Sequence, residues 1–287
     1  MSSGRVRPIS DIGECMIKAW IVRLAFTSTD YLDMRLTIVA TVLSLVAFNT
    51  FAGWFGFGGT SWKEEVLLHD GSKLVVERSV SRGGPHEIGQ RGSYTKETLA
   101  FTHPVSGKRV TWEDIATADL GNSNFLPMAL DVYQDAAYLV AYPMGCLSYN
   151  KWGRPNPPYV VFKLTDRTWT RIALRELPSE TTALNLLFSS PDTEVENLGR
   201  HFVDAETIKR IATEYSQPEF KAILRDEITM PESGCTKMDY YPNAGWLGPD
   251  WFSRQPSLDA CLQFCERRRI AAELCPCKDV FKASAAR

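Results

Sequence analysis

The chain has 287 residues, enough for one large domain or two small ones, and its apolar fraction of 44% supplies a core and excludes wholesale disorder. The formal net charge of -2 excludes a nucleic-acid-binding role, because binding to phosphates requires a basic face. The longest basic run, Arg267 to Arg269, is explained by a solvated helix face.

Residues 1–33 carry scattered basic residues and precede Met34-Arg35, which is followed directly by an apolar stretch. That order is typical of the start of a signal peptide. We therefore expect translation to begin at Met34, with residues 1–33 an over-extended reading of the gene. If residues 1–33 are translated, their basic residues place them in the cytoplasm.

Residues 34–58 form a hydrophobic leader, since no charged residue lies between Arg35 and Lys63. The apolar part, residues 36–58, is intermediate in length between a signal-peptide core and a membrane span. The leader is therefore predicted to be either a cleaved signal peptide or an uncleaved anchor crossing the inner membrane once. In both cases residues 59–287 are expected outside the cytoplasm, in the cell envelope.

Residues 59–230 have the pattern of a β-rich domain. Asp70-Gly71 predicts a hairpin between strands at residues 65–69 and 73–80, because both turn positions tolerate positive φ. Along the second strand Leu74, Val76 and Val80 share one face, on which Arg78 is the exception. A second hairpin is expected over residues 98–112, and Thr111 then predicts the N-cap of a short helix that ends near Gly121.

Residues 128–174 have the most regular pattern, with four strands expected in a meander. The insert at residues 143–158 is rich in Pro and Gly and predicts an exposed loop. An antiparallel sheet or sandwich is the expected architecture. Helices are predicted after Asp204 and from Pro218, so the fold class is α+β and β-rich.

Residues 231–287 form a cysteine-rich tail in which Ser257 is expected to cap a last helix over residues 258–274. After residue 58 the chain has six cysteines, an even number that suits disulfides in an exported domain; the seventh, Cys15, lies in residues 1–33. A zinc site is one alternative, because four thiolates in the tail suit zinc, although their spacing lacks the usual Cys-x2-Cys pairs. Free or partly paired thiols are another. The sequence leaves the pairing open, and the disulfide candidates are Cys146, Cys235, Cys261, Cys265, Cys275 and Cys277.

No catalytic motif, cofactor motif or metal-ligating histidine pair is present in the sequence. The insert contains residue types that are common at binding hot spots, namely Tyr149, Trp152 and Arg154. Together with Tyr159 they are a candidate recognition surface for a protein or a glycan. A loop pinned to the domain by its own aromatic residues is the alternative.

The stretch from Trp62 to Gly71, with Val75 to Arg78, resembles the start of uncharacterised exported proteins of proteobacteria, in which it also follows a short hydrophobic leader. The resemblance covers about residues 34–175 and implies an envelope location without implying an activity. We therefore expect a non-enzymatic binding or scaffolding protein of the cell envelope. The alternative is an extracytoplasmic hydrolase whose site combines residues distant in sequence.

Overall fold

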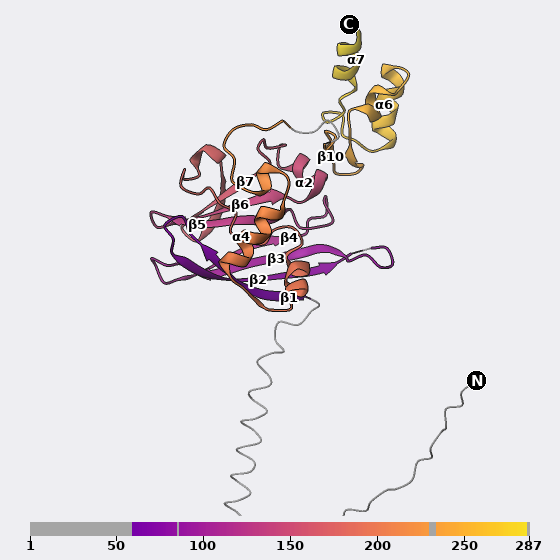
Figure 1. The fold of residues 1–287 in the computed structure, drawn as a ribbon. Helices are drawn as coiled ribbons and strands as arrows, with labels where there is room; N and C mark the ends of the chain where they lie inside the picture. Colours follow the sequence, from indigo (N-terminus) through magenta and orange to yellow (C-terminus); the bar gives the residue numbers. More distant parts are fainter. Residues whose placement is uncertain (1–58, 85, 230–233, 286–287) are drawn as a thin grey trace, which may run out of the picture. The chain divides into compact units, whose positions relative to one another are not determined.

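The computed structural model describes residues 59–84, 86–229 and 234–285 (Figure 1). The predicted leader and membrane segment, residues 1–33 and 34–58, lie outside these ranges. Within them, no helix combines the length and the apolar character that crossing a membrane requires.

The first sheet has five strands in the order β4-β3-β2-β1-β9. All neighbours are antiparallel except β1 and β9, which run parallel. The predicted hairpin at Asp70-Gly71 joins β1 to β2, and Gly71 has a φ of 83°. The strands are β1 (Gly59–Leu67), β2 (Lys73–Gly83), β3 (Ser93–Thr102), β4 (Arg109–Ile115) and β9 (Phe202–Val203).

The second sheet is the predicted four-stranded meander, in the order β5-β6-β7-β8. Gln134 and Asp135 form the turn between the first two strands, with φ angles of 45° and 67°. Two successive residues at positive φ match the right-handed twist of a hairpin. The strands are β5 (Phe125–Tyr133), β6 (Ala136–Pro143), β7 (Val160–Thr165) and β8 (Thr168–Ile172).

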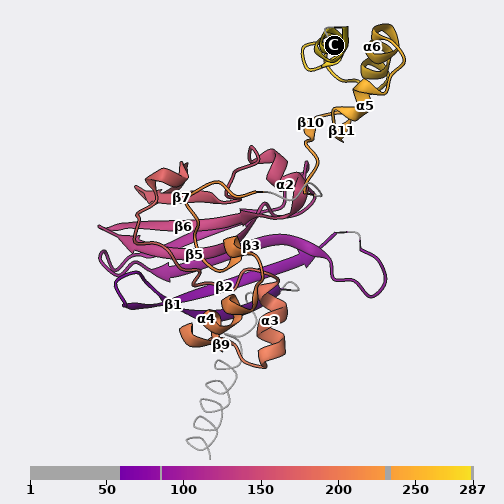
Figure 2. The same ribbon diagram turned by 45° about the horizontal axis from the view of Figure 1, so that its top comes forward.

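The two sheets pack face to face around the main hydrophobic core (Figures 1 and 2). Leu99 and Phe101 of the first sheet share this core with Leu130, Leu139 and Phe162 of the second. The alternation of buried and exposed residues along each strand produces the apolar inner faces. The prediction of a β-rich α+β fold with antiparallel sheets is confirmed, and its architecture is a sandwich.

A buried ionic cluster interrupts the inner face of the first sheet. Arg78 donates from Nη1 to Glu64 Oε1 at 2.9 Å and also to the carbonyl of Leu187. Glu64 accepts from Trp62 Nε1 at 2.6 Å and from the Leu187 amide at 3.1 Å. Glu97 is 1% exposed, and neither of its carboxyl oxygens has a hydrogen-bond partner among the described residues. Burial raises the pKa of Glu97 to about 8.

Residues 111–121 do not form the predicted helix, because Arg109–Ile115 is strand β4. Trp112 and Asp114 are both buried on the inner face, two residues apart, which is the period of a strand. Asp114 accepts hydrogen bonds from the backbone amides of Asn124 and Phe125 instead of capping a helix. Thr111 suggested a helix start, but Asp114, three residues later, holds the chain that enters β5.

Two helices, α3 (Pro191–Leu198) and α4 (Ala205–Glu214), follow the meander. Asp204 caps α4 as predicted, accepting from the Thr207 amide at 2.8 Å, and Ile208 is buried. The helix predicted from Pro218 is wrong, since only one 3-10 turn forms, η2 (Pro218–Phe220). The chain beyond it pairs with the loop at residue 182 instead, because the Ile223 amide donates to Thr182 O at 2.8 Å.

The tail has its own hydrophobic core, built from two short strands and three helices. The predicted last helix is shorter than expected, because it ends in a Schellman motif. Arg269 adopts a φ of 55°, and the Ile270 amide donates to Cys265 O. Ile270 then turns into the core of the tail. The elements are β10 (Asp239–Tyr241), β11 (Gly245–Leu247), α5 (Asp250–Ser253), α6 (Leu258–Arg267) and α7 (Cys277–Ala285).

Candidate functional site: the disulfide-anchored tail

The insert predicted as a loop at residues 143–158 begins with a helix, α2 (Gly145–Lys151). Ser148 and Tyr149 are buried on its inner side, and Ser148 donates to the carbonyl of Asn124. The prediction of an exposed loop is therefore wrong for the first half of the insert. Four of the six Pro and Gly residues of the insert follow the helix, and the insert as a whole therefore has the composition of a loop.

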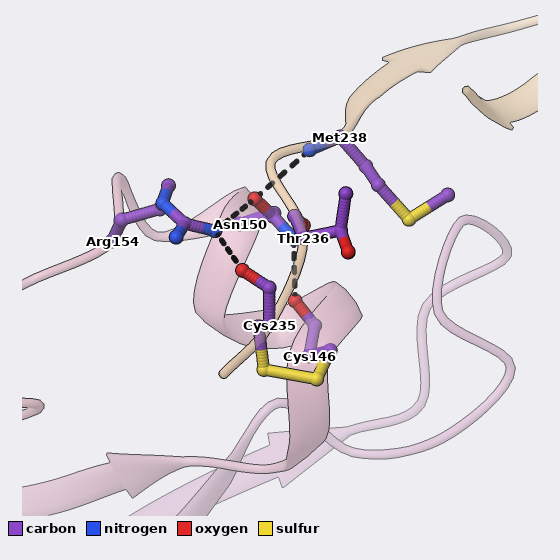
Figure 3. The surroundings of a disulfide bond; sticks show 6 residues. All are labelled: Cys146, Asn150, Arg154, Cys235, Thr236 and Met238. Atoms are coloured by element: carbon purple, nitrogen blue, oxygen red, sulfur yellow. Dashed lines mark hydrogen bonds between the residues drawn. A yellow bond between two sulfur atoms is a disulfide. The ribbon is translucent and has the colours of Figure 1, made fainter. Parts of the chain in front are cut away.

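A disulfide between Cys146 of α2 and Cys235 joins the sandwich to the first residues of the tail (Figure 3). Asn150, one turn after Cys146, donates to Thr236 O at 2.9 Å and accepts from the Met238 amide at 3.1 Å. The Asn150 side chain therefore hydrogen-bonds to one backbone carbonyl and one backbone amide of the tail, as a neighbouring strand would. Sequence reasoning missed Asn150, whose only signal was its place between two candidate residues.

Arg154 completes this junction. Its Nη1 donates to Cys235 O at 2.8 Å and to Asn150 Oδ1 at 3.0 Å (Figure 3). The guanidinium carbon also lies 5.0 Å from the centre of the Tyr149 ring. The junction is therefore fixed by one covalent bond and a small hydrogen-bond network.

The four predicted binding residues are not on one open surface. Tyr149 and Tyr159 are 7% and 3% exposed. Trp152 packs on the main core, with its ring 4.6 Å from that of Phe125. Arg154 donates its Nη1 hydrogen bonds to Asn150 and Cys235 at the junction with the tail. The structure brings Tyr149, Arg154 and the tail together but leaves little of these side chains for an external partner.

Tyr159 holds a different part of the chain. Its hydroxyl donates to Glu219 O at 2.8 Å, which fixes the segment after α4 on the second sheet. Burial raises the pKa of Tyr159 to about 12, so the hydroxyl stays protonated and remains a donor at physiological pH.

All six predicted cysteines lie at disulfide distance from a partner. The tail pairs are Cys261 with Cys277 and Cys265 with Cys275. Cys261 and Cys265 lie one turn apart on α6, and Pro276 turns the chain so that both later cysteines reach them. The pairs thus join α6 to residues 275–277 at the start of α7, and these two helices contribute half of the buried residues of the tail's core.

Reduction of these bonds should release the tail and spare the sandwich. The tail disulfides close loops of 16 and 10 residues, each worth about 2–4 kcal/mol. In the presence of a chelator, reduced protein should become sensitive to chymotrypsin near Trp246 or Trp251, while a fragment ending near residue 230 survives. Mass spectrometry of the digest measures this. Identical digestion before and after reduction would contradict a structural role for the bonds.

Comparisons of this chain with protein-family models, curated proteins and solved structures find no match. The resemblance to exported proteins of proteobacteria therefore stays a prediction.

A histidine–carboxylate pair is present at the other end of the sandwich. His69 Nδ1 lies 2.8 Å from Asp131 Oδ1, and Thr181 Oγ1 donates to Asp131 Oδ2 at 2.6 Å. The hydrogen bond with Asp131 raises the pKa of His69. Among the described residues, no hydroxyl or thiol hydrogen-bonds to Nε2 of this ring. The arrangement orients a histidine as hydrolases do, without a nucleophile in contact.

Two hollows in the described part of the chain lie elsewhere. One, of about 280 Å³, is bordered by ion-paired side chains, among them Arg82 with Asp192 and Arg91 with Glu196. The other, of about 420 Å³, lies beside α4 and includes Lys209 and Lys221. His69 lines neither hollow, so the histidine–carboxylate pair has no substrate cavity among them.

The tail exposes large apolar side chains although its core is closed. Trp251 is 44% exposed, and Leu258 and Leu262, one turn apart on α6, are each 37% exposed. The guanidinium carbon of Arg268 lies 5.5 Å from the centre of the Trp251 ring. Tryptophan and arginine are the residue types most enriched at binding hot spots.

Proposed function

We propose that this protein is an extracytoplasmic binding protein in which the β-sandwich presents the disulfide-closed tail to a protein partner. The observation that carries the proposal is the tail itself. It is a small module closed by two disulfides, attached to the sandwich by a third, and it keeps apolar side chains at its surface. Disulfides persist in oxidising compartments, which supports an envelope location.

The exposed chemistry suggests the kind of partner. Trp251, Leu258 and Leu262 offer apolar area, and Arg268 holds a positive charge against the Trp251 ring. A protein surface that is apolar and bears a carboxylate would complement this set. The disulfide of Cys146 and the hydrogen bonds of Asn150 restrict the tail at its junction with the sandwich, which limits the entropy lost when such a partner binds.

Photo-crosslinking in native membranes tests this proposal. A benzophenone side chain replaces Leu262 on α6, and the matched control replaces Val75, which is 48% exposed on the outer face of the sandwich. We expect one crosslinked product of defined mass at position 262, reduced in yield by Trp251→Ala and absent at position 75. Equal crosslinking at both positions would contradict the proposal.

The second candidate function is an extracytoplasmic hydrolase, which the pair of His69 and Asp131 favours. That proposal requires His69→Ala to abolish hydrolysis of a chromogenic ester or peptide substrate while leaving thermal unfolding nearly unchanged. If no turnover depends on His69, the hydrolase function is excluded.

A further inference from the structure

Four sulfur atoms lie together in the core of the tail. Besides the two disulfides, Cys265 Sγ lies 3.6 Å from Cys277 Sγ. The sulfurs of Cys265, Cys275 and Cys277 are all within 4.8 Å of one another, and Cys261 is bonded to the last of these. Two separate disulfides therefore form one compact sulfur cluster.

The size of this cluster fits a zinc ion. Tetrahedral zinc binds thiolates at about 2.3 Å, which places the sulfurs about 3.8 Å apart. The distance between Cys265 and Cys277 already has this value within a few tenths of an ångström. The bonded sulfurs have to separate, and Cys261, which is bonded to Cys277 but is not one of the three mutually close sulfurs, has to move toward Cys265 and Cys275. The four cysteines come from two short segments, α6 and residues 275–277 at the start of α7.

The surroundings of the cluster favour metal over free thiolates. Cys261, Cys265 and Cys277 are at most 3% exposed, and a buried thiolate without a counter-charge is costly. Helix α7 begins at Cys277, so the positive end of its dipole lies next to the sulfurs and stabilises their charged form. A divalent ion would neutralise half of the charge of four thiolates.

We propose that the tail is a redox-dependent zinc site, in which Cys261, Cys265, Cys275 and Cys277 bind Zn²⁺ once their two disulfides are reduced. A dithiol reductant supplies two electrons and two protons to each disulfide and becomes a cyclic disulfide itself. Zinc then displaces the protons of the four thiols, which pass to solvent. The inference gives the proposed binding module a second folded state, and it does not depend on the identity of any partner.

Metal binding to the full chain tests the inference. The protein is reduced with a phosphine, freed of reductant without air, and titrated with Zn²⁺ or Co²⁺. We expect one zinc per chain, and with cobalt the charge-transfer and visible bands of a tetrahedral thiolate complex. Zinc should also restore the resistance of the tail to chymotrypsin. Removing a residue that only hydrogen-bonds to a metal ligand lowers metal affinity about 10–100-fold. Cys265→Ser removes a ligand itself, so it should lower the zinc affinity by at least this factor.

The matched control is the double variant Cys146→Ser/Cys235→Ser, which lacks the third disulfide and keeps all four ligands. It should bind one zinc with unchanged affinity. Substoichiometric zinc, an octahedral cobalt spectrum, or equal affinity in Cys265→Ser would each overturn the inference. Partner crosslinking is measured on oxidised protein, so its failure and the failure of zinc binding are separate results.

Discussion

Replacing Glu97 by glutamine should make the protein more stable at neutral and alkaline pH, and the gain should grow as the pH rises. Folded Glu97 has a pKa of about 8, against 4.5 for the ordinary side chain, because burial disfavours its charge. Between these values the folded state retains a proton that the unfolded state has lost. Stability therefore falls as pH rises through this window, by about 1.4 kcal/mol per pH unit.

The difference between wild type and Glu97→Gln isolates this contribution from that of other groups. It should be small near pH 4.5 and reach about 3–5 kcal/mol at pH 8. Urea unfolding at several pH values measures it. Glu113→Gln is the control, because Glu113 is 40% exposed and paired with Lys96, so its change should stay below about 1 kcal/mol. A difference independent of pH would show that Glu97 is not buried as a neutral acid.

Replacing Arg78 by methionine should lower the free energy of unfolding by about 3–5 kcal/mol, because it leaves the buried carboxylate of Glu64 without its cation. The Arg78 and Glu64 side chains are 2% and 0% exposed, so solvent does not replace the lost partner. The variant also loses the hydrogen bond to the Leu187 carbonyl. Chemical unfolding at pH 7 measures the effect.

Arg109→Met is the matched control for Arg78→Met. Arg109 pairs with Glu77 at the surface, with side chains 58% and 44% exposed, so its removal should cost less than about 1 kcal/mol. Similar losses in the two variants would contradict the assignment of Arg78 to a buried pair. Arg78 also lowers the pKa of Glu97, so Arg78→Met should shift the pH dependence of Glu97 to still higher pH.

The sheets were largely predictable from the sequence, because turns and alternation act locally. Asp70-Gly71 and Gln134-Asp135 both place strands in the expected hairpins. The buried ionic cluster was not predicted, although Arg78 stood out on an apolar face. Its partner Glu64 lies 14 residues away, across a hairpin, and the Leu187 carbonyl lies 109 residues away. Contacts of that separation depend on the register of strands and the path of loops.

The junction with the tail shows the same limit. The cysteines were identifiable as disulfide candidates, but six cysteines allow fifteen pairings, and no local pattern selects Cys146 with Cys235 across 89 residues. The sequence does not indicate the role of Asn150, because its partners are backbone groups of the tail. Conversely, Tyr149 and Tyr159 are of a residue type that is common at binding surfaces, but both side chains are buried. Residue type alone does not distinguish a binding aromatic from a packing one.

The redox state of the cysteines in protein taken from its native compartment tests the account most directly. Cells are quenched with acid, thiols are alkylated, and peptides are mapped by mass spectrometry before and after reduction. The account predicts that Cys146, Cys235, Cys261, Cys265, Cys275 and Cys277 resist alkylation until reductant is added, with the pairs 146–235, 261–277 and 265–275 recovered as linked peptides. Alkylation of all six cysteines without reductant would contradict an oxidised, extracytoplasmic binding module.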